Sequence, residues 1–414
     1  MARIRPFAGI RPATDKVARM VSPSPDRLSA QAIQEELSNN PDSFLQILFP
    51  DFLDKIITEP GSPERLLKTK QRYNSYLQEQ RLLRDNKPAY YIYRQQSDNH
   101  FYVGIMACTS IDDYRNGVIK VHEATLTDRE EKLRAYLEVC GYNAEPVLFA
   151  YPDHSDINKW VTTQIQQKPI YDFVTQGNLH HEIWMVNSEN EIKILTNYFS
   201  ELFAIYIADG HHRSASSALL GESKRIQNPN YTGEEPWNFY LGIFFPESQL
   251  NILPYHRVTT DLNGLTPEQF LAALSNDFTV DSISAADAQP PARHSFTLYV
   301  DKKWYLLTLK PERVQEGDPV HALDAYLLTH YILNPILGIS DLKTDTRIGF
   351  ISGNSEIHEL ENQVNSGKYS AAFGLFPVQM DELKRIADSG AIMPPKSTWV
   401  EPKLKTGLII YSLE

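Results

Sequence analysis

Three observations predict an α+β fold for this chain of 414 residues. Strand-like and helix-like segments are mixed along the chain, and two pairs of strand-like segments have the spacing of hairpins. The length is sufficient for two or three domains with a sizeable core. This mixture argues against a regular doubly wound sheet, and the sequence contains neither a Walker loop nor the glycine fingerprint of a dinucleotide-binding fold.

The N-terminal part is expected to begin as extended chain and to continue as helix and hairpin. Residues 1–30 are rich in Pro, Arg and Ser, which favour turns and extended segments. Residues 30–85 have apolar anchors among polar residues and are predicted to be helical. Residues 88–94 and 101–107 are aromatic and β-branched, and the Ser-Asp-Asn sequence at 97–99 between them predicts a β-hairpin.

The middle of the chain is predicted to alternate between strands and helices. Strand-like apolar segments occupy residues 118–121, 146–151, 182–186 and 238–245. Helical segments are expected at residues 127–139, from Glu191 towards residue 209, and at residues 214–220. The apolar run at 202–208 fits either a strand or a buried helix, and in both cases it delivers the chain to a turn that contains glycine.

The last third of the chain adds a helix start and a second hairpin. Thr266 followed by Pro267 predicts the beginning of a helix, because proline is well tolerated in the first turn. Residues 295–300 and 303–309 form a hairpin pattern around an Asp-Lys pair. The other elements expected here are a helix at residues 324–332 and strands at residues 371–377 and 408–411.

The composition indicates a globular protein and excludes several classes. The formal net charge of -12 argues against a general nucleic-acid binder, because a phosphate backbone requires a basic face. No apolar run approaches the length of a membrane span, and no apolar segment typical of a signal peptide follows the N-terminus. Cys108 and Cys140 are too few for a cysteine-based zinc site and suggest a reducing compartment. We therefore expect a cytoplasmic protein with neither a nucleic-acid nor a membrane partner.

The most informative segment is the Asp-Gly-His-His-Arg sequence at residues 209–213. Because a small-residue helix follows it, the turn would expose backbone N–H groups at a helix N-terminus, where the helix dipole favours anions. An acid, two imidazoles and a guanidinium are also the groups that phosphate binding and proton transfer require. The alternative is an Asp helix cap with a surface Arg and two His residues of no function. The site expected here consists of Asp209, Gly210, His211, His212 and Arg213.

Two further segments contain residues suited to the same chemistry. His122 and Glu123 lie between a strand and a helix, where a partly buried Glu can act as a general base or can simply favour the helix start. The Pro-Pro-Lys-Ser-Thr loop at 394–398 either binds phosphate with help from Lys403 and Lys405, or only leads to the final strand. In the first interpretation the loop folds back over the central site, and its candidate ligands are Lys396, Ser397 and Thr398. The sequence predicts no metal-ligand set.

These motifs resemble those of a bacterial and archaeal family called domain of unknown function 1015. The similar pieces occur in order and reach both ends of the chain, at residues 6–12, 117–125, 209–213, 255–257 and 393–408. The chain departs from the family at residues 22–27, where Ser-Pro-Ser-Pro-Asp-Arg replaces a Pro-Pro-Tyr-Asp-Val-like stretch. The expected regions are an N-terminal extension (1–117), a core (118–261) and a C-terminal α+β region (262–414).

The core also resembles the ParB/sulfiredoxin-like fold, which includes an ADP-dependent free-serine kinase, SerK. The strand that ends in His122 and Glu123 is similar to the kinase strand whose Glu is the proposed base. Residues 209–213 resemble the Asp-Gly-His-x-Arg phosphate turn of that kinase, and the ParB version of this turn binds nucleotide phosphates. His211 stands where sulfiredoxin has its cysteine, so sulfinic acid reduction is not expected. The resemblance implies a ParB/sulfiredoxin-like mixed core with additional N- and C-terminal α/β regions.

The residues and the resemblance together predict a protein that binds a nucleotide or another phosphorylated small molecule. As a SerK-like kinase, it would transfer a phosphoryl group to a small hydroxyl acceptor. Gly210 and Arg213 would hold the phosphates, with His122 among the ligand contacts. The implied cofactors are Mg²⁺ and a nucleotide, ADP or ATP.

The expected catalytic residues have separate roles. Glu123 takes the proton of the acceptor hydroxyl, and Asp209 orients a histidine or a metal-bound water. His211 and His212 contact phosphate or donate a proton. Two alternatives remain open: a non-catalytic nucleotide-binding switch of the ParB type, and an interaction protein that retains only the fold. The sequence does not set the oligomeric state or the acceptor.

Overall fold

The computed structural model describes residues 1–52, 54, 57–97, 100–314 and 317–414. The chain divides into two compact units, each of which we describe by itself. Unit 1 contains Met1–Val121, Thr125–Leu250 and Pro402–Glu414, and unit 2 contains His122–Ala124 and Asn251–Glu401. Within the described ranges, no helix has both the length and the apolar character needed to cross a membrane.

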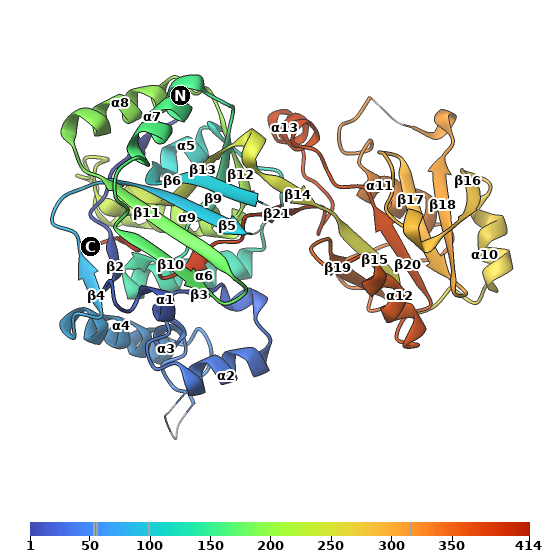
Figure 1. The fold of residues 1–414 in the computed structure, drawn as a ribbon, viewed down its shortest axis with the longest axis horizontal. Helices are drawn as coiled ribbons and strands as arrows, with labels where there is room; N and C mark the ends of the chain where they lie inside the picture. The colour runs from blue at the N-terminus through green and yellow to red at the C-terminus, as the bar shows by residue number, and fades with distance from the viewer. Residues whose placement is uncertain (53, 55–56, 98–99, 315–316) are drawn as a thin grey trace. The chain divides into compact units, whose positions relative to one another are not determined.

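Unit 1 is built on a mixed β-sheet, which has nine strands among the described residues (Figure 1). The strand order is β10 (Tyr171–Thr175), β11 (Leu179–Val186), β5 (Tyr90–Ser97), β6 (His100–Ser110), β13 (Phe239–Pro246), β9 (Val147–Tyr151), β12 (Ile205–Asp209) and β7 (Ile119–Lys120), and β1 (Ile4–Arg5) pairs with β6. The pairs β13–β9 and β12–β7 are parallel, whereas the other neighbours are antiparallel. The central strands bury aromatic and β-branched side chains, as in the stacked rings of Phe149 and Phe244, so the core of unit 1 lies along this sheet.

Helices pack around the sheet of unit 1 and follow local sequence signals. They are α1 (Val17–Met20), α2 (Ala30–Asn39), α3 (Leu45–Leu48), α4 (Pro63–Gln78), α5 (Ile111–Arg115), α6 (Thr127–Cys140), α7 (Ser155–Gln164), α8 (Glu189–Ser200) and α9 (His211–Gln227). Helix α4 begins with a Ser62 cap and Pro63 in its first turn, and α6 ends at Gly141 with φ 78°. Helix α6 packs along α9, and α7 lies beside α8 (Figure 1).

Three short strand pairs bind the two ends of the chain into unit 1. They are β2 (Ile10–Pro12) with β4 (Leu82–Arg84), β3 (Ser22–Pro23) with β22 (Lys405–Thr406), and β8 (Tyr142–Asn143) with β23 (Tyr411–Ser412). The pair β3–β22 joins segments almost four hundred residues apart in the sequence. It therefore brings an N-terminal and a C-terminal segment together in the same unit.

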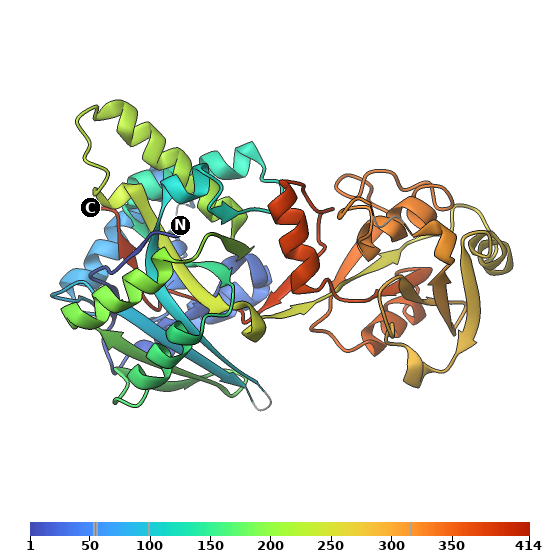
Figure 2. The ribbon, with the colours of Figure 1, turned by 90° about the horizontal axis from the view of Figure 1, so that it is seen from above.

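Unit 2 contains an antiparallel sheet, with six strands in the part of the chain that the structure describes. Its order is β16 (Phe278–Ile283), β18 (Lys303–Leu309), β17 (Ser295–Val300), β20 (Ala371–Leu375), β15 (Tyr255–Thr259) and β19 (Ile348–Ser352), and β14 (Asn251–Leu253) pairs separately with β21 (Trp399–Glu401). The helices are α10 (Pro267–Leu274), α11 (Asp324–Leu328), α12 (His358–Asn365) and α13 (Met380–Ser389). Figure 2 shows α10, in yellow, beside β16 at the end of this sheet.

One buried carboxyl group stands out in unit 2. Asp324 begins α11, and one of its oxygens accepts a hydrogen bond from the backbone N–H of His294 at 2.9 Å. The other oxygen has no hydrogen-bond partner among the described residues. Burial is the main cause that raises the pKa of Asp324 to about 8, so the folded protein favours its protonated form.

The mixed α and β architecture predicted from the sequence is confirmed, as are both hairpins. Strands β5 and β6 pair antiparallel, although the predicted Ser-Asp-Asn turn lies partly outside the described residues. Strands β17 and β18 flank Asp301 and Lys302, whose φ angles of 48° and 58° suit a tight hairpin turn. The division into three sequence regions and the ParB/sulfiredoxin-like label stay predictions.

Several element predictions are wrong in detail. Residues 30–85 do not form continuous helix: α2, α3 and α4 are separated by segments that contain Pro41, Pro50 and Pro60, since proline disfavours helix in the preceding residue. Residues 53, 55 and 56 of that prediction lie outside the described residues. The helix predicted from Glu191 ends at Ser200, and the apolar run before the key turn contains strand β12. The final strand is shorter than predicted, because only Tyr411–Ser412 pairs as β23.

Candidate functional site

The predicted turn connects strand β12 to helix α9 in unit 1. Asp209 is the last residue of β12, His211 is the first residue of α9, and Gly210 between them has φ 106°. This left-handed conformation strains any residue with a Cβ atom. A Cβ atom at Gly210 would also lie 2.8 Å from Nε of Arg213. Glycine is therefore favoured by the backbone conformation, and a Cβ atom here would also force the guanidinium of Arg213 to move.

Helix α9 begins directly after Gly210. Gly210 occupies the N-cap position, and no side chain of the described residues caps the helix. The helix is 17 residues long, so its first N–H groups and its dipole favour negative charge at this end. The helix packs closely on its neighbours through small residues such as Ser214 and Ala215, which are buried. The predicted turn at a helix start is present, but Asp209 and Gly210 are half-buried and His211 is buried.

Three cations surround the carboxylate of Asp209. Its oxygens lie 3.7 Å from Nη2 of Arg213, 3.5 Å from Nζ of Lys403 and 4.0 Å from Nη2 of Arg27. Burial would raise the pKa of Asp209, but the positive charges of Arg213, Lys403 and Arg27 outweigh it and lower the pKa. Asp209 is therefore ionised near neutral pH and holds the cations in place, so it is unsuited to donate a proton.

A second carboxylate, Glu145, connects the turn to both ends of the chain. It accepts hydrogen bonds from Nη1 of Arg213 at 2.9 Å and from Oγ1 of Thr406 at 2.7 Å. The hydroxyl of Ser24 donates to it at 3.3 Å. Glu145 thus orients the guanidinium of Arg213, whose side chain is about one quarter exposed at 26%.

The sequence analysis missed part of this arrangement. Arg27 comes from a 3₁₀ turn, Pro25–Arg27, and Glu145 precedes β9, and neither was a candidate. Lys403 and Lys405 were expected only to add charge near the C-terminal loop. The pairing of β3 with β22 brings these segments to the turn, and such a contact between chain ends has no local sequence signal.

The two histidines of the turn differ in burial. His211 is buried at the first position of α9, and His212 is half-buried. The hydroxyl of Ser216 donates to the backbone carbonyl of His212 at 2.7 Å, and Ser217 donates likewise to Arg213 at 2.8 Å. These bonds fix the first turns of α9. The predicted contacts of His211 and His212 with phosphate stay predictions.

Strand β7, which precedes the His-Glu motif, lies beside β12, the strand that leads to the turn. Strand β7 ends at Lys120 and runs parallel to β12, with Lys120 opposite Tyr206. Both strands therefore release the chain at the same edge of the sheet of unit 1. The motif itself belongs to unit 2, where His122 is fully buried and Glu123 is exposed.

Residues of the predicted C-terminal loop contact different partners. Within unit 2, the backbone N–H of Met393 donates to the carbonyl of His122 at 2.9 Å, so the loop starts beside the His-Glu motif. The hydroxyl of Ser397 donates to Pro394 O at 2.7 Å, and Nζ of Lys396 lies 5.3 Å from the ring centroid of Tyr255. The predicted ligand roles of Lys396, Ser397 and Thr398 stay predictions.

A buried arginine stiffens this loop. Arg257 lies in strand β15 and is 1% exposed. Its guanidinium donates to the carbonyls of Tyr255 at 2.8 Å and Lys396 at 3.0 Å, and it lies 4.6 Å from the ring centroid of Phe350. Burial lowers the pKa of Arg257 to about 9. These contacts indicate a structural role for this residue.

One cluster in unit 1 has the residue types of a metal site. Asp172, His180 and Glu182 each offer one ligand atom, and these atoms lie within 4.8 Å of one another. The register of β10 and β11 puts Asp172 opposite Glu182, with His180 on the same face. However, Glu182 pairs with Arg94, and Nε2 of His180 lies 2.6 Å from Asp172. A cation would have to displace Arg94, so the cluster functions first as an ion-pair network.

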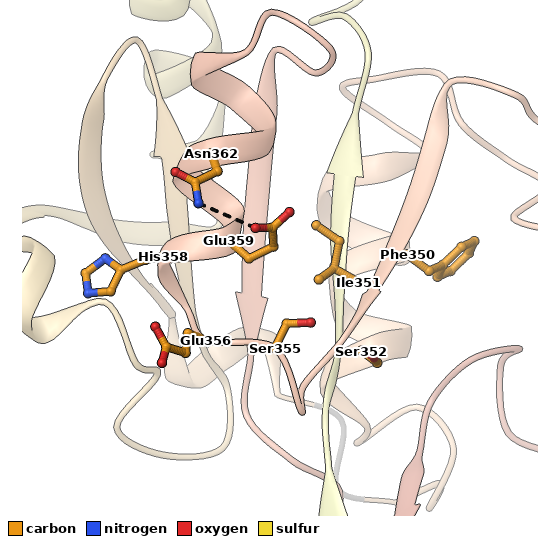
Figure 3. A pocket seen from close by; sticks show the side chains of 8 residues that line it. All are labelled: Phe350, Ile351, Ser352, Ser355, Glu356, His358, Glu359 and Asn362. Carbon is orange, nitrogen blue, oxygen red and sulfur yellow. Dashed lines mark hydrogen bonds between the residues drawn. The ribbon is translucent and has the colours of Figure 1, made fainter. Parts of the chain in front are cut away.

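A pocket of about 530 Å³ lies in unit 2 between β19 and α12 (Figure 3). In this view Glu359, which accepts a hydrogen bond from Asn362 at 3.4 Å, lies near Ile351. Hydrogen bonds from Gln363 and Asn362 lower the pKa of Glu359, so this carboxylate is ionised. Glu356 also lines the pocket, and its lining has no Lys or Arg. Its charge is therefore wrong for phosphate, and none of the sequence-predicted site residues lines it.

Comparisons with known proteins place this chain in a family and return weak structural similarities. The model of a family described as protein of unknown function (DUF1015) matches residues 4–326. No curated protein matches the chain. A free serine kinase in complex with AMP is 12% identical, with a TM-score of 0.36, and the match covers 73% of this chain and 91% of the kinase chain.

Two other solved structures have similar scores. SbnI with a C-terminal truncation from Staphylococcus aureus is 12% identical, with a TM-score of 0.38 and coverage of 73% of this chain and 87% of its own. A conserved hypothetical protein from Pyrococcus furiosus is 12% identical, with a TM-score of 0.36 and coverage of 74% and 95%. Similarities at this level do not decide the function of this chain.

Proposed function

The chain belongs to the DUF1015 family, and we propose that it binds a phosphorylated small molecule, in particular a nucleotide, at residues 209–213. The observation that carries this proposal is the grouping of Arg213, Lys403 and Arg27 around an uncapped helix N-terminus. In a chain with a net charge of -12, such a local concentration of cations is suited to an anion. The proposed activity is transfer of a phosphoryl group from the nucleotide to a small hydroxyl acceptor.

In the binding step, phosphate oxygens would accept hydrogen bonds from the first N–H groups of α9. The guanidinium of Arg213 offers two parallel donors that match a phosphate, and Lys403 adds a point charge. Asp209 and Glu145 hold these cations before the ligand arrives, so little side-chain ordering remains when it binds. Gly210 lets the guanidinium of Arg213 pack directly against the backbone of the turn.

The turn fits a phosphate better than it fits Mg²⁺. Magnesium prefers carboxylate oxygens and water, and Asp209 and Glu145 are already paired with cations. The positive side chains therefore balance the phosphate charge without a metal at this position. The expectation of Mg²⁺ as a cofactor stays a prediction.

In the transfer step, Glu123 is the proposed base. Its carboxylate would take the proton of the acceptor hydroxyl while the hydroxyl oxygen forms a bond to phosphorus and the bond from phosphorus to the nucleotide oxygen breaks. Support for this role comes from the motif resemblance and from the parallel strands β7 and β12, which end at the same edge of the sheet. His211 and His212 are the proposed phosphate contacts or proton donors.

The test combines ligand binding with turnover. Calorimetric titration of the full chain with AMP, ADP and ATP should give saturable binding, and the bound donor should phosphorylate a member of a panel of small hydroxyl compounds. Absence of binding by all three nucleotides and by inorganic phosphate would contradict the binding proposal. Binding without turnover across the panel would instead favour a nucleotide-dependent switch, which should show a ligand-dependent change in mass.

A further inference from the structure

The pocket between β19 and α12 lies entirely within unit 2, and we propose that it binds a small aliphatic ammonium compound. Its volume of about 530 Å³ is within the range of about 300–1,000 Å³ that is typical of small-molecule sites. The proposal goes beyond the proposed function and does not depend on it, because residues 209–213 belong to unit 1.

The carboxylate of Glu359 is held by two amides and has room for a ligand. Its Oε1 accepts a hydrogen bond from Nε2 of Gln363 at 2.5 Å, and its Oε2 accepts one from Nδ2 of Asn362 at 3.4 Å. A carboxylate has about four lone-pair positions, so two are left open by the described residues. The hydrogen bond from Gln363, then that from Asn362, and to a smaller extent the charge of Lys368 lower the pKa of Glu359. The ionised group is therefore suited to an ammonium group, which has three N–H donors.

A second acid, Glu356, adds negative charge to the lining. Its carboxylate forms neither an ion pair nor a hydrogen bond with any other of the described residues. His358, which also lines the pocket, lies 3.5 Å from a third acid, Glu361. Because the lining contains no Lys or Arg, a positively charged ligand would meet carboxylates that have no ion-pair partner in the pocket wall.

The rest of the lining suits an aliphatic body better than a bare metal ion. Ile351 contributes apolar surface, and Ser355 contributes a hydroxyl group. In Figure 3 the side chains of Glu359 and Ser355 point toward Ile351. In the described ranges, no group of three metal-ligating side chains close enough for one ion includes Glu356 or Glu359. A carboxylate beside an aliphatic wall matches a ligand that carries its charge on a chain of methylene groups.

The alternative is that these acids only stabilise the start of α12, where the helix dipole favours negative charge. Glu359 is in the first turn of this eight-residue helix, and Glu356 precedes the helix. This alternative predicts that removal of either charge lowers the melting temperature and that the wild type binds no amine. Saturable binding of an amine therefore separates a ligand site from a helix-capping role.

The experiment is a ligand-observed NMR titration of the full chain with 1,4-diaminobutane and, in parallel, with the neutral 1,4-butanediol. The wild type should bind the diamine saturably and should not bind the diol. Glu359→Gln keeps the shape of the side chain and removes its charge. The affinity for the diamine should then fall by about three- to tenfold, between the effects of an exposed ion pair and of a charge-assisted hydrogen bond. Glu312→Gln removes the same charge from an exposed position outside the lining and should leave the affinity unchanged.

A further variant separates binding in the pocket from attraction to an acidic surface. The chain has a net charge of -12, so a cation is attracted to many positions on it. Ser355→Leu keeps every charge but fills space beside Glu359, and it should abolish saturable binding. If the wild type does not bind the diamine, or if either Glu359→Gln or Ser355→Leu binds it as the wild type does, the proposal is wrong. Should Glu359→Gln misfold by circular dichroism, Ser355→Leu decides the question. Failure of the chain to bind nucleotides and phosphate would refute the proposed function and leave this site standing.

Discussion

The substitution Arg213→Ala removes the guanidinium that the account assigns to the phosphate. In the unliganded chain this group donates to Glu145 at 2.9 Å and lies 3.7 Å from Asp209. A charge-assisted hydrogen bond to a phosphate contributes about 1.5–3 kcal/mol, so the affinity for a phosphate ligand should fall by roughly 10- to 150-fold. Because the ligand must share Arg213 with two carboxylates, the lower part of this range is the better expectation.

The fold should survive this change. The ion pair of Arg213 with Glu145 is partly exposed, with side-chain exposures of 26% and 25%, and such pairs contribute at most about 1 kcal/mol. Calorimetric titration with phosphate or a nucleotide measures the affinity, and a thermal melt checks the fold. Lys224→Ala is the matched control, since Lys224 is on the same helix, is paired with Glu138 and lies about 16 Å further along by helix rise. Equal affinity of wild type and Arg213→Ala would refute the assignment of this turn.

Three other substitutions test separate parts of the account. Gly210→Ala should lower the melting temperature and weaken phosphate binding, because φ 106° strains a residue with a Cβ atom and the guanidinium of Arg213 would have to move; normal binding would contradict this. Glu123→Gln should reduce turnover by roughly 10²–10⁴ with little loss of nucleotide affinity, and full turnover would eliminate it as the base. The free energy of unfolding of the wild type should fall as pH rises from about 4 to about 8, because Asp324 keeps its proton in the folded state and loses it on unfolding. Asp324→Asn should lack this part of the pH dependence when melts at pH 5 and pH 8 are compared.

Local features of the turn could be predicted from the sequence. The apolar run before Asp209, the glycine after it and the small residues of α9 each act on their own neighbourhood, so strand, turn and helix were identifiable. The same is true of the hairpin at Asp301 and Lys302. The helix predicted across residues 30–85 is wrong because prolines interrupt the apolar pattern and end the helices.

Contacts between distant segments could not be predicted in this way. Arg27 follows β3, which pairs with β22, and no local signal in residues 22–27 or 402–406 predicts that pairing. Glu145 reaches the turn because β9, which it precedes, lies beside β12 in the sheet. Lys403 was recognised as a charge but not as a partner of Asp209. The pairing also explains why the cation cluster is larger than the Asp-Gly-His-His-Arg motif alone indicates.

The most direct test of the central claim is a crystal structure of the full chain with inorganic phosphate. The account predicts a phosphate at the N-terminus of α9, within hydrogen-bond distance of the backbone N–H groups of residues 211–213 and of the guanidinium of Arg213. A phosphate bound elsewhere, with this turn empty at a saturating concentration, would contradict the assignment.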